Sequence, residues 1–343
     1  MRILLTGNNG YIGTVLTNEL IKRKYEIVGF DIDYFYDCNL IECNSKLIKH
    51  IRKDIRTIID TDLDEIDAVI HLAGLANDPL GELNPKLTKE INFNSTLSLA
   101  EICKKKGIQR FIYASSQSMY GISDNKEELD EDKSLKNPVT AYAKTKWEAE
   151  KRLKDMNDDN FTVVMFRPST VFGVSPRLRC DIVYNSFVAC AYTTGKIEIL
   201  SDGSPFRPVI HIQDLCNALI SGIEAPKELV SGQSFNVGIK DGNYTVKELA
   251  ESAQRVVPGS DLVFLNKHTD PRTYRVSFQK ILTVLNDYFK PKWTLDKGGL
   301  ELIEYFKKID FSEFDFRDEK VNRLKRLESL INQKKINDRL EWI

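Results

Sequence analysis

Several features that mark common functional classes are scarce in this sequence of 343 residues. Its 49 basic and 50 acidic residues nearly cancel, which leaves a net charge of −1. No bulk electrostatic attraction to nucleic acid or to a membrane surface is therefore expected. The chain has only four histidines, and its six cysteines are scattered without a CxxC pair. These absences favour a reduced, cytoplasmic setting and no metal site.

Long apolar runs are also missing. No stretch approaches the roughly 20 consecutive apolar residues that a membrane-spanning helix needs. The segment Met1–Thr6 reads as a strand that leads into a glycine-rich turn, so no secretory signal is expected. An apolar fraction of 42% and a charged fraction of 29% are ordinary for a soluble globular protein. The length suits one large domain or two intimately packed domains.

What the first half does contain is a regular alternation of strand and helix patterns. Strands are expected at Arg2–Thr6, Glu26–Asp31, Ala68–Leu72, Arg110–Ser115 and Thr162–Arg167. Helical patterns separate them at Tyr11–Lys24, Pro85–Lys106 and Thr140–Asp155. Such alternation predicts an α/β fold, with a parallel sheet covered by helices on both faces.

The pattern becomes irregular after Phe172. Prolines and arginines gather in Ser175–Arg179, and glycine and proline gather in Asp202–Pro208. Two later runs, Pro208–Ile212 and Ser234–Val237, read as strands that return to the sheet. We therefore predict a first domain over residues 1–168 with return segments at about 208–238, and a smaller, discontinuous second domain made of residues 169–207 and 239–310.

Residues 311–343 form a distinct tail. Apolar residues recur in it at helical spacing amid many charges, namely Val321, Leu324, Leu327, Leu330 and Ile331. This spacing predicts an amphipathic helix that docks on the body or on a neighbouring subunit. A separate binding function is the alternative.

The segment Thr6–Gly13 follows an expected strand and opens an expected helix. Its glycines at positions 7, 10 and 13 permit a tight turn, close approach to a pyrophosphate and close helix packing. Asp31 closes the second strand 18 residues after Gly13. An acidic group there can accept both ribose hydroxyls and repel a 2′-phosphate. The pattern predicts a dinucleotide site that prefers NAD to NADP; the alternative is a turn that binds nothing.

Further cofactor contacts are expected after the third and fourth strands, because the carboxyl ends of such strands border the cofactor crevice. Asp54 can accept a hydrogen bond from the adenine amine or can be a solvated loop residue. Small residues at positions 73 and 74 let an adenosine lie against the backbone. The predicted cofactor residues in this half are Gly7, Asn9, Gly10, Tyr11, Ile12, Gly13, Asp31, Asp54, Ile55, Leu72, Ala73, Gly74 and Asn92.

Tyr142 and Lys146 are four residues apart and therefore share one helix face. A tyrosine is a poor base because its pKa is near 10. The lysine ammonium, together with a positive nicotinamide ring, is expected to lower that pKa. Upstream, Tyr113–Ser116 ends a strand and can supply a hydroxyl to the same substrate oxygen. We infer removal of a proton from a sugar hydroxyl while its carbon gives a hydride to NAD; the alternative is a chance pair of surface residues.

Together the motifs GxxGxxG, YASSxSxYG, YxxxK and RPSTVFG resemble those of the extended short-chain dehydrogenases, the nucleotide-sugar epimerase and dehydratase family. The resemblance reaches to about Pro291. It implies a doubly wound Rossmann domain, a smaller carboxyl-terminal substrate domain, retained NAD and a homodimer. It also implies a catalytic triad of Ser116, Tyr142 and Lys146, with the first two at the sugar 4-hydroxyl and Lys146 also at the nicotinamide ribose. Pro168 would lie beside the nicotinamide amide.

The residues after the serine bear on which reaction follows. Sugar 4,6-dehydratases of this family carry an Asp-Glu pair there, whereas this chain has Gln117 and Ser118, neither of which titrates usefully. We therefore expect a 4-epimerase that works by transient oxidation at carbon 4. A C4 dehydrogenase or 4-ketoreductase is the alternative, followed by a dehydratase with unusual acid and base residues. A non-catalytic NAD sensor is a third possibility.

Arginines in the irregular half are candidates to grip a diphosphate, because a guanidinium suits bidentate contacts. By resemblance, Arg207 matches a diphosphate-binding arginine, Arg272 lies near a second one, and Asn185 matches an asparagine with the same role. Ordinary surface salt bridges are the alternative for Arg177 and Arg179. The predicted substrate residues are Ser116, Gln117, Thr170, Arg177, Arg179, Asn185, Arg207 and Arg272. The family often has asparagine at the position of Thr170, so no particular sugar nucleotide is inferred.

Overall fold

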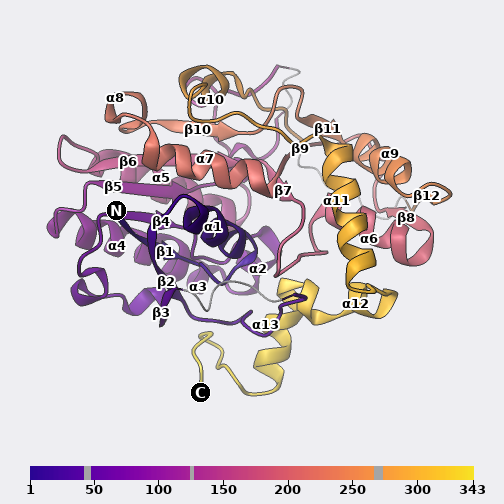
Figure 1. The fold of residues 1–343 in the computed structure, drawn as a ribbon, viewed down its shortest axis with the longest axis horizontal. Helices are drawn as coiled ribbons and strands as arrows, with labels where there is room; N and C mark the ends of the chain where they lie inside the picture. The colour runs from indigo at the N-terminus through magenta and orange to yellow at the C-terminus, as the bar shows by residue number, and fades with distance from the viewer. Residues whose placement is uncertain (42–47, 124–126, 266–272) are drawn as a thin grey trace.

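The computed structural model describes residues 1–41, 48–123, 127–265 and 273–343. A seven-stranded sheet in the order β10-β6-β5-β4-β1-β2-β3 forms its centre, and every neighbouring pair in it is parallel (Figure 1). Its strands are β1 Arg2–Thr6, β2 Glu26–Asp31, β3 Lys49–Arg52, β4 Ala68–His71, β5 Arg110–Ala114, β6 Thr162–Pro168 and β10 Ser234–Val237. The predicted α/β class with a doubly wound parallel sheet is thus confirmed.

Strand bounds in the sheet agree closely with the sequence pattern, with one exception. β1, β2 and β10 coincide with the predicted runs, and β4, β5 and β6 end within one residue of theirs. No bounds were predicted for β3, because its sequence Lys49–Arg52 lacks an apolar run and both of its ends are exposed. It forms the edge of the sheet beside β2, where one side of the strand has no partner among the described strands.

Helices cover both faces of this sheet. On one face α1 packs beside α7, and on the other α4 packs beside α5 (Figure 1). Alternate residues of one strand reach the two cores: Leu5 joins the cluster under α1, while Leu4 joins the cluster under α4. The helices of this half are α1 Tyr11–Lys22, α2 Asp78–Leu83, α3 Pro85–Lys89, α4 Ser95–Lys105, α5 Ala141–Met156, α7 Ile212–Glu224 and α8 Lys227–Val230, with 3-10 turns η2 Ile55–Thr57, η3 Asp60–Leu63 and η5 Gln117–Tyr120.

One predicted helix is interrupted. Instead of a single helix over Pro85–Lys106, the chain forms α3, a π-helical turn η4 at Glu90–Asn94, and α4. Within the π turn, Asn92 accepts a hydrogen bond from Leu75 N at 2.8 Å and donates one to Leu75 O at 3.0 Å. The prediction of a continuous helix was wrong because periodicity alone does not register this tertiary contact.

A second set of elements lies beyond β6. A three-stranded sheet consists of β7 Thr170–Phe172, β9 Phe206–His211 and β11 Asn243–Thr245, and a two-stranded sheet pairs β8 Lys196–Ile199 with β12 Asp261–Phe264. The helices here are α6 Val183–Thr194, α9 Val246–Val256, α10 Gln279–Val284 and α11 Leu295–Lys308. In Figure 1 most of these elements lie to the right of the central sheet. The domain boundaries given above remain predictions.

The prediction that Pro208–Ile212 returns to the main sheet was wrong. This run belongs to β9, which pairs in parallel with β7 and antiparallel with β11. The main-sheet position beside β6 is taken by β10, where Ser234 lies opposite Met165. β9 instead leads directly into α7.

The tail contains α12 Glu313–Arg317, the 3-10 turn η6 Glu319–Val321 and α13 Arg323–Asn332. The amphipathic pattern corresponds to α13, with Asn322 as its N-cap. Val321, Leu327 and Leu330 are buried against the body of the same chain. The tail therefore docks on its own chain in this structure.

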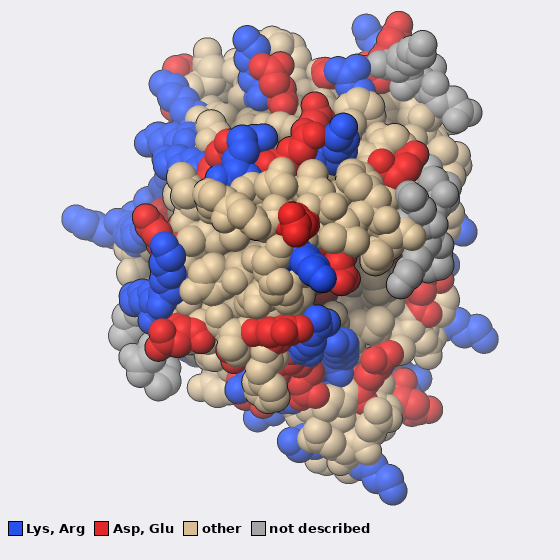
Figure 2. Space-filling view, turned by 90° about the vertical axis from the view of Figure 1, so that its right-hand side faces the viewer, with Lys and Arg blue, Asp and Glu red and all other residues tan. Residues whose placement is uncertain are grey.

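No single charge dominates the face of the molecule that Figure 2 draws. Figure 2 shows the face that carries α6, α11 and α12, where basic and acidic side chains are interspersed between broad uncharged areas. Over the part of the chain that the structure describes, no helix combines the length and apolar character that crossing a membrane requires.

A buried ion pair fastens α5 to three strands. Arg167 on β6 donates from Nε to Glu150 Oε1 at 3.0 Å, and both side chains are at most 3% exposed. Ser115, next to β5, and Ser234, at the start of β10, each donate a hydroxyl hydrogen bond to Glu150 at 2.7 Å. Burial alone would raise the pKa of Glu150, but the Arg167 charge and these hydrogen bonds hold it below its usual value.

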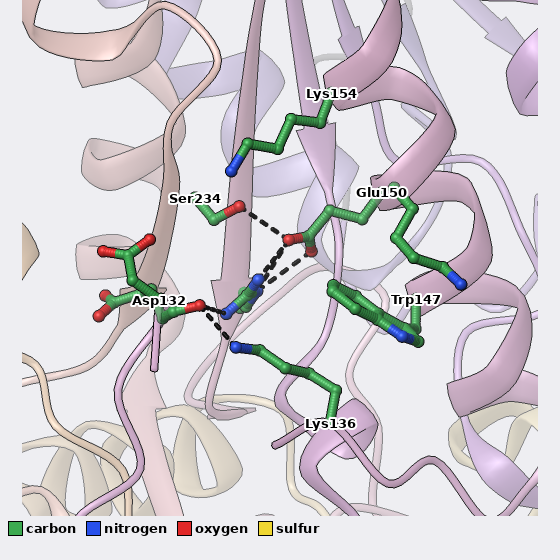
Figure 3. Close-up of a pocket in the computed structure, with 9 residues that line it drawn as sticks. Asp132, Lys136, Trp147, Glu150, Lys154 and Ser234 are labelled. Carbon is green, nitrogen blue, oxygen red and sulfur yellow. Dashed lines mark hydrogen bonds and ion pairs between the residues drawn. The ribbon is translucent and has the colours of Figure 1, made fainter. Parts of the chain in front are cut away.

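The pair lies at the floor of a small cavity of about 130 Å³ (Figure 3). Trp147 lies beside the cavity, and Lys154 and Lys136 extend toward the cavity from opposite sides. Lys136 donates to Glu131 O at 2.7 Å and to Ser134 O at 2.6 Å. The ion pair and Lys136 form their hydrogen bonds with protein groups. We therefore interpret the cavity as part of the structural scaffold beside α5.

Replacing Glu150 by alanine should destabilise the fold strongly. The change leaves the Arg167 charge buried without its carboxylate, and breaking a buried pair in this way costs about 3–5 kcal/mol. Urea unfolding measures the loss. Glu148→Ala, on the same helix but half-buried, is the matched control and should cost about 1 kcal/mol or less. Equal losses in the two variants would contradict the role given to the pair.

Candidate active site

In the turn between β1 and α1, backbone segments approach one another so closely that two positions have no room for a side chain. Gly7 has φ +72°, and a Cβ on Gly13 would lie 2.1 Å from Gly7 O, so both positions need glycine. Gly10 is the N-cap of α1, where no side chain caps the helix and no acidic residue stands in its first turn. The first amides of α1, including those of Tyr11 and Ile12, are therefore left to an anionic ligand such as a phosphate.

Asp31 lies against this turn at the end of β2. Its carboxylate accepts hydrogen bonds from Asn9 N at 3.0 Å and from Asp33 N at 2.8 Å. Burial raises its pKa, and these two hydrogen bonds oppose the rise. The residue predicted to hold the adenosine ribose thus also shapes the glycine-rich turn.

Asp33 is a residue of this corner that the sequence analysis missed. It accepts a hydrogen bond from Asn9 Nδ2 at 2.5 Å and pairs with His50 Nε2 at 3.0 Å. Although burial opposes the change, these contacts lower its pKa. The available signal was a second aspartate two positions after Asp31, at a site with φ +66°, which aspartate tolerates better than most residues.

The segments after β3 and β4 complete this end of the sheet. Asp54 caps η2 through Arg56 N at 2.8 Å and pairs with the Arg56 guanidinium at 2.5 Å, so it is not a freely solvated loop residue. A carboxylate has about four acceptor sites, and contact with an adenine amine stays a prediction. Ile55, beside it, is buried.

The segment Leu72–Gly74, which follows β4, contacts the glycine-rich turn. A Cβ on Gly7 would lie 2.8 Å from Ala73 N, and a Cβ on Gly74 would lie 2.9 Å from Asn92 Oδ1. The predicted cofactor residues of β1, β2 and β4 are thus brought to one corner. Asn92 is bonded to Leu75, which makes it a residue that positions this loop.

The three predicted catalytic residues also lie together. Thr140 caps α5, so that Tyr142 stands in its first turn and Lys146 one turn later, both buried. Ser116 lies just beyond β5 and close to Tyr142, whose pKa it lowers. Lys146 Nζ donates to Ala114 O at 2.7 Å, two residues before Ser116. Pro168 ends the adjacent strand β6.

The protein alone does not lower the pKa of Tyr142. Burial raises it to about 12, against the opposing effects of the Ser116 hydrogen bond and the Arg179 charge. Burial lowers the pKa of Lys146 to about 8. Lys146 alone therefore does not bring the tyrosine pKa below its usual value, because both groups are buried and desolvation dominates; the lowering expected from the lysine together with a nicotinamide ring stays a prediction. A further positive charge beside Tyr142 is needed to favour its phenolate.

Gln117 and Ser118 point in different directions. Gln117 is 1% exposed and donates from Nε2 to Arg167 O at 3.0 Å and to Val237 O at 3.4 Å, while its Oε1 accepts a hydrogen bond from Ser169. The Gln117 amide is thus used inside the fold, and its contact with substrate stays a prediction. Ser118 Oγ accepts a hydrogen bond from Ser116 Oγ at 3.1 Å.

Neither Arg177 nor Arg179 is a surface arginine. Arg177 is fully buried and donates to Asn9 O and to Asn39 Oδ1, so it braces the glycine-rich turn. Arg179 is 8% exposed and pairs with Asp181 at 2.8 Å. Its charge lowers the pKa of Tyr142. The surface alternative was wrong for both.

Asn185 is hydrogen-bonded to groups inside the fold. It accepts a hydrogen bond from Gly173 N at 3.0 Å and donates to Tyr11 Oη at 3.2 Å and to Arg179 O at 2.9 Å. Both of its N–H groups are used in these bonds, and its role as a diphosphate ligand stays a prediction. Tyr11 in turn donates to Gly173 O at 2.7 Å and joins the glycine-rich turn to the second half of the chain.

The remaining candidates stay predictions. Thr170 lies on β7 opposite Val209 and is half-buried, and Arg207 on β9 is also half-buried and donates to Phe206 O at 2.8 Å. Arg272 lies outside the described residues.

Comparison with known proteins identifies the family. The model of the "NAD dependent epimerase/dehydratase family" matches residues 3–238. A UDP-glucose 4-epimerase of Bacillus subtilis is 28% identical over 289 residues, which are 75% of this chain and 82% of the relative. A UDP-glucuronic acid decarboxylase of Arabidopsis thaliana is 27% identical over 322 residues, which are 90% of this chain and 70% of the relative.

A solved structure agrees with these relatives. UDP-glucuronic acid 4-epimerase from Bacillus cereus, in complex with UDP-glucuronic acid and NAD, superposes with a TM-score of 0.75 at 25% identity and covers 90% of this chain and 100% of its own. The resemblance noted from the motifs is confirmed: this chain is an enzyme of the NAD-dependent epimerase/dehydratase family, with NAD as its cofactor.

Proposed function

We propose that the chain is a nucleotide-sugar 4-epimerase that oxidises and re-reduces carbon 4 of the sugar. The observation that carries this proposal is the grouping of Ser116, Tyr142 and Lys146 at the edge of the sheet that also holds the glycine-rich turn. The relatives that act on UDP-sugars support a UDP-sugar as substrate. We further propose a cytoplasmic homodimer, following the family resemblance.

The residues present fit NAD. Close backbone contacts at Gly7 and Gly13 leave no room for a Cβ, the amino end of α1 lacks a side-chain cap, and Asp31 accepts a hydrogen bond from the same turn, where it could accept the ribose hydroxyls. When bound, NAD accepts a hydride from the sugar carbon and returns it.

The protein's own residues move the proton. Tyr142 would take the proton of the 4-hydroxyl and give it back when the ketone is reduced. Ser116, which lies close to Tyr142 and donates to Ser118 in this structure, would instead donate to the same sugar oxygen. Lys146, one helix turn from Tyr142, would support negative charge on its oxygen.

The neighbourhood of Ser116 disfavours dehydration. Elimination of water across carbons 5 and 6 needs an acid and a base, and the two following residues are an amide turned into the fold and a serine bonded to Ser116. Chemistry confined to carbon 4 needs neither group. Return of the hydride to the opposite face then gives the 4-epimer.

The decarboxylase relative favours a second candidate. If the sugar carries a carboxylate on carbon 5, a ketone at carbon 4 is β to it, and carbon dioxide can leave with the bonding electrons going to the ketone. A C4 dehydrogenase or 4-ketoreductase shares the same first step. All of these reactions use the same three side chains, and they differ in the fate of the 4-ketone.

Product analysis decides between these reactions. Purified protein without added cofactor would be incubated with UDP-, GDP-, dTDP- and CDP-sugars, including UDP-glucuronic acid, and the products read by NMR. Catalytic formation of a 4-epimer supports the proposal. Release of a keto sugar with NADH left on the protein, or of a pentose with carbon dioxide, would contradict it.

Tyr142→Phe should lower turnover by about 10²–10⁴-fold, because it removes the proton acceptor. NAD binding, measured by titration, should stay within about threefold of the unchanged protein, since a 0.6 kcal/mol difference is about that factor. Tyr192→Phe is the control, because that half-buried ring makes an aromatic contact with Phe306 away from the catalytic helix. Full activity of Tyr142→Phe would remove Tyr142 from its role.

Asp31→Asn should relax the preference for NAD over NADP by about tenfold or more, a change of about 1.4 kcal/mol. The amide keeps one acceptor for Asn9 N but loses the charge that repels a 2′-phosphate. Asp31→Ala should relax it further, because it also removes the support of the turn. Dissociation constants for both cofactors give the ratio, and an unchanged ratio in both variants would place Asp31 away from the ribose.

A further inference from the structure

The end of the tail meets the loop that follows Asp31. Trp342 donates from its indole Nε1 to Ile32 O at 2.7 Å, and Tyr34 donates its hydroxyl to Leu340 O. The rings of Tyr34 and Trp342 are 6.0 Å apart. These contacts join positions about 310 residues apart in the chain and hold the backbone next to the proposed ribose ligand.

The same stretch of tail also meets the two other segments that border the proposed adenosine site. The Arg52 guanidinium, at the end of β3, lies 4.9 Å from the Trp342 ring. Glu341 is 3.9 Å from Arg56, the ion-pair partner of Asp54. Arg339 pairs with Glu90 at 3.2 Å, at the start of the π turn that carries Asn92. Residues 339–342 thus contact the loop that follows Asp31, the segment at the end of β3 and the π turn.

The start of α13 holds the other side of the glycine-rich turn. Arg323 is 2% exposed and donates from Nη2 to Arg177 O at 2.7 Å, while Arg177 itself donates to Asn9 O. Cys180 N donates to Val321 O at 2.8 Å. Arg326 pairs with Asp37, in the loop after β2, at 2.6 Å. The tail is therefore anchored on both sides of the proposed cofactor site.

We propose that the carboxyl-terminal tail, residues 321–342, retains NAD by fixing the loops that border its adenosine half. The inference rests on the cofactor site proposed above. By linkage, if the tail stabilises the arrangement that binds NAD, bound NAD must stabilise the docked tail by the same amount. Loss of a tail contact should therefore speed NAD release without touching the residues that carry out the chemistry.

Three variants test this in the full-length holoenzyme. Trp342→Phe keeps the ring contacts and loses the hydrogen bond to Ile32, and Tyr34→Phe loses the one to Leu340. Each should speed exchange of bound NAD for labelled NAD about fivefold, the factor that corresponds to one ordinary hydrogen bond. Trp342→Ala, which also removes the packing, should speed it by about tenfold or more.

Phe314→Ala is the matched control, because Phe314 lies on α12, just before residues 321–342, and is 79% exposed; its exchange rate should equal that of the unchanged protein. Exchange is measured below the melting temperature of every variant, and hydrogen exchange of residues 321–342 should slow when NAD is bound. If Trp342→Ala fails to fold, the two phenylalanine variants decide.

Unchanged NAD exchange in folded Trp342→Phe and Tyr34→Phe would overturn the proposal. Hydrogen exchange of residues 321–342 that stays the same when NAD is bound would also overturn it. Neither measurement uses a sugar nucleotide. Failure of the epimerase assignment would therefore leave this result intact, and the two proposals can fail separately.

Discussion

The buried pair of Glu150 and Arg167 is the constraint on which the candidate site depends. Tyr142, Lys146 and Glu150 follow one another at intervals of four residues, so they share one face of α5. By fixing Glu150 to the strands β5, β6 and β10, the pair sets the height and rotation of the helix. Tyr142 then meets Ser116 at the carboxyl end of β5, the edge where cofactors of this fold class bind.

Burial of this helix face has an electrostatic consequence. It keeps the proton on Tyr142 and weakens the hold of Lys146 on its own proton. Proton removal by Tyr142 is therefore unfavourable until a positive charge is bound nearby. In the proposed mechanism the action of Tyr142 as a base would accordingly depend on the cofactor, and such an enzyme would benefit from keeping its cofactor in place. The tail contacts at Trp342 offer a physical means of doing so.

Local pattern explains what the sequence predicts well. The central strands are buried on both faces, so their apolar runs stand out, and Gly7 is required by the turn itself. Lys49–Arg52 escapes prediction because an edge strand needs no apolar run. The roles of Gln117 and Asn185 could not be predicted, because their amide groups bond to backbone and side chains far along the chain. The hydrogen bond between Trp342 and Ile32 likewise could not be predicted from the spacing of residues in the sequence.

In the proposed reaction the hydride taken from carbon 4 is returned to the same carbon by a cofactor that stays bound. A UDP-sugar that carries deuterium at carbon 4 can be used to follow this hydride, with NMR or mass spectrometry of the product and no added NAD. We expect a 4-epimer that keeps its deuterium at carbon 4. A 4-epimer that has lost the deuterium, or a product that is oxidised or decarboxylated, would contradict it.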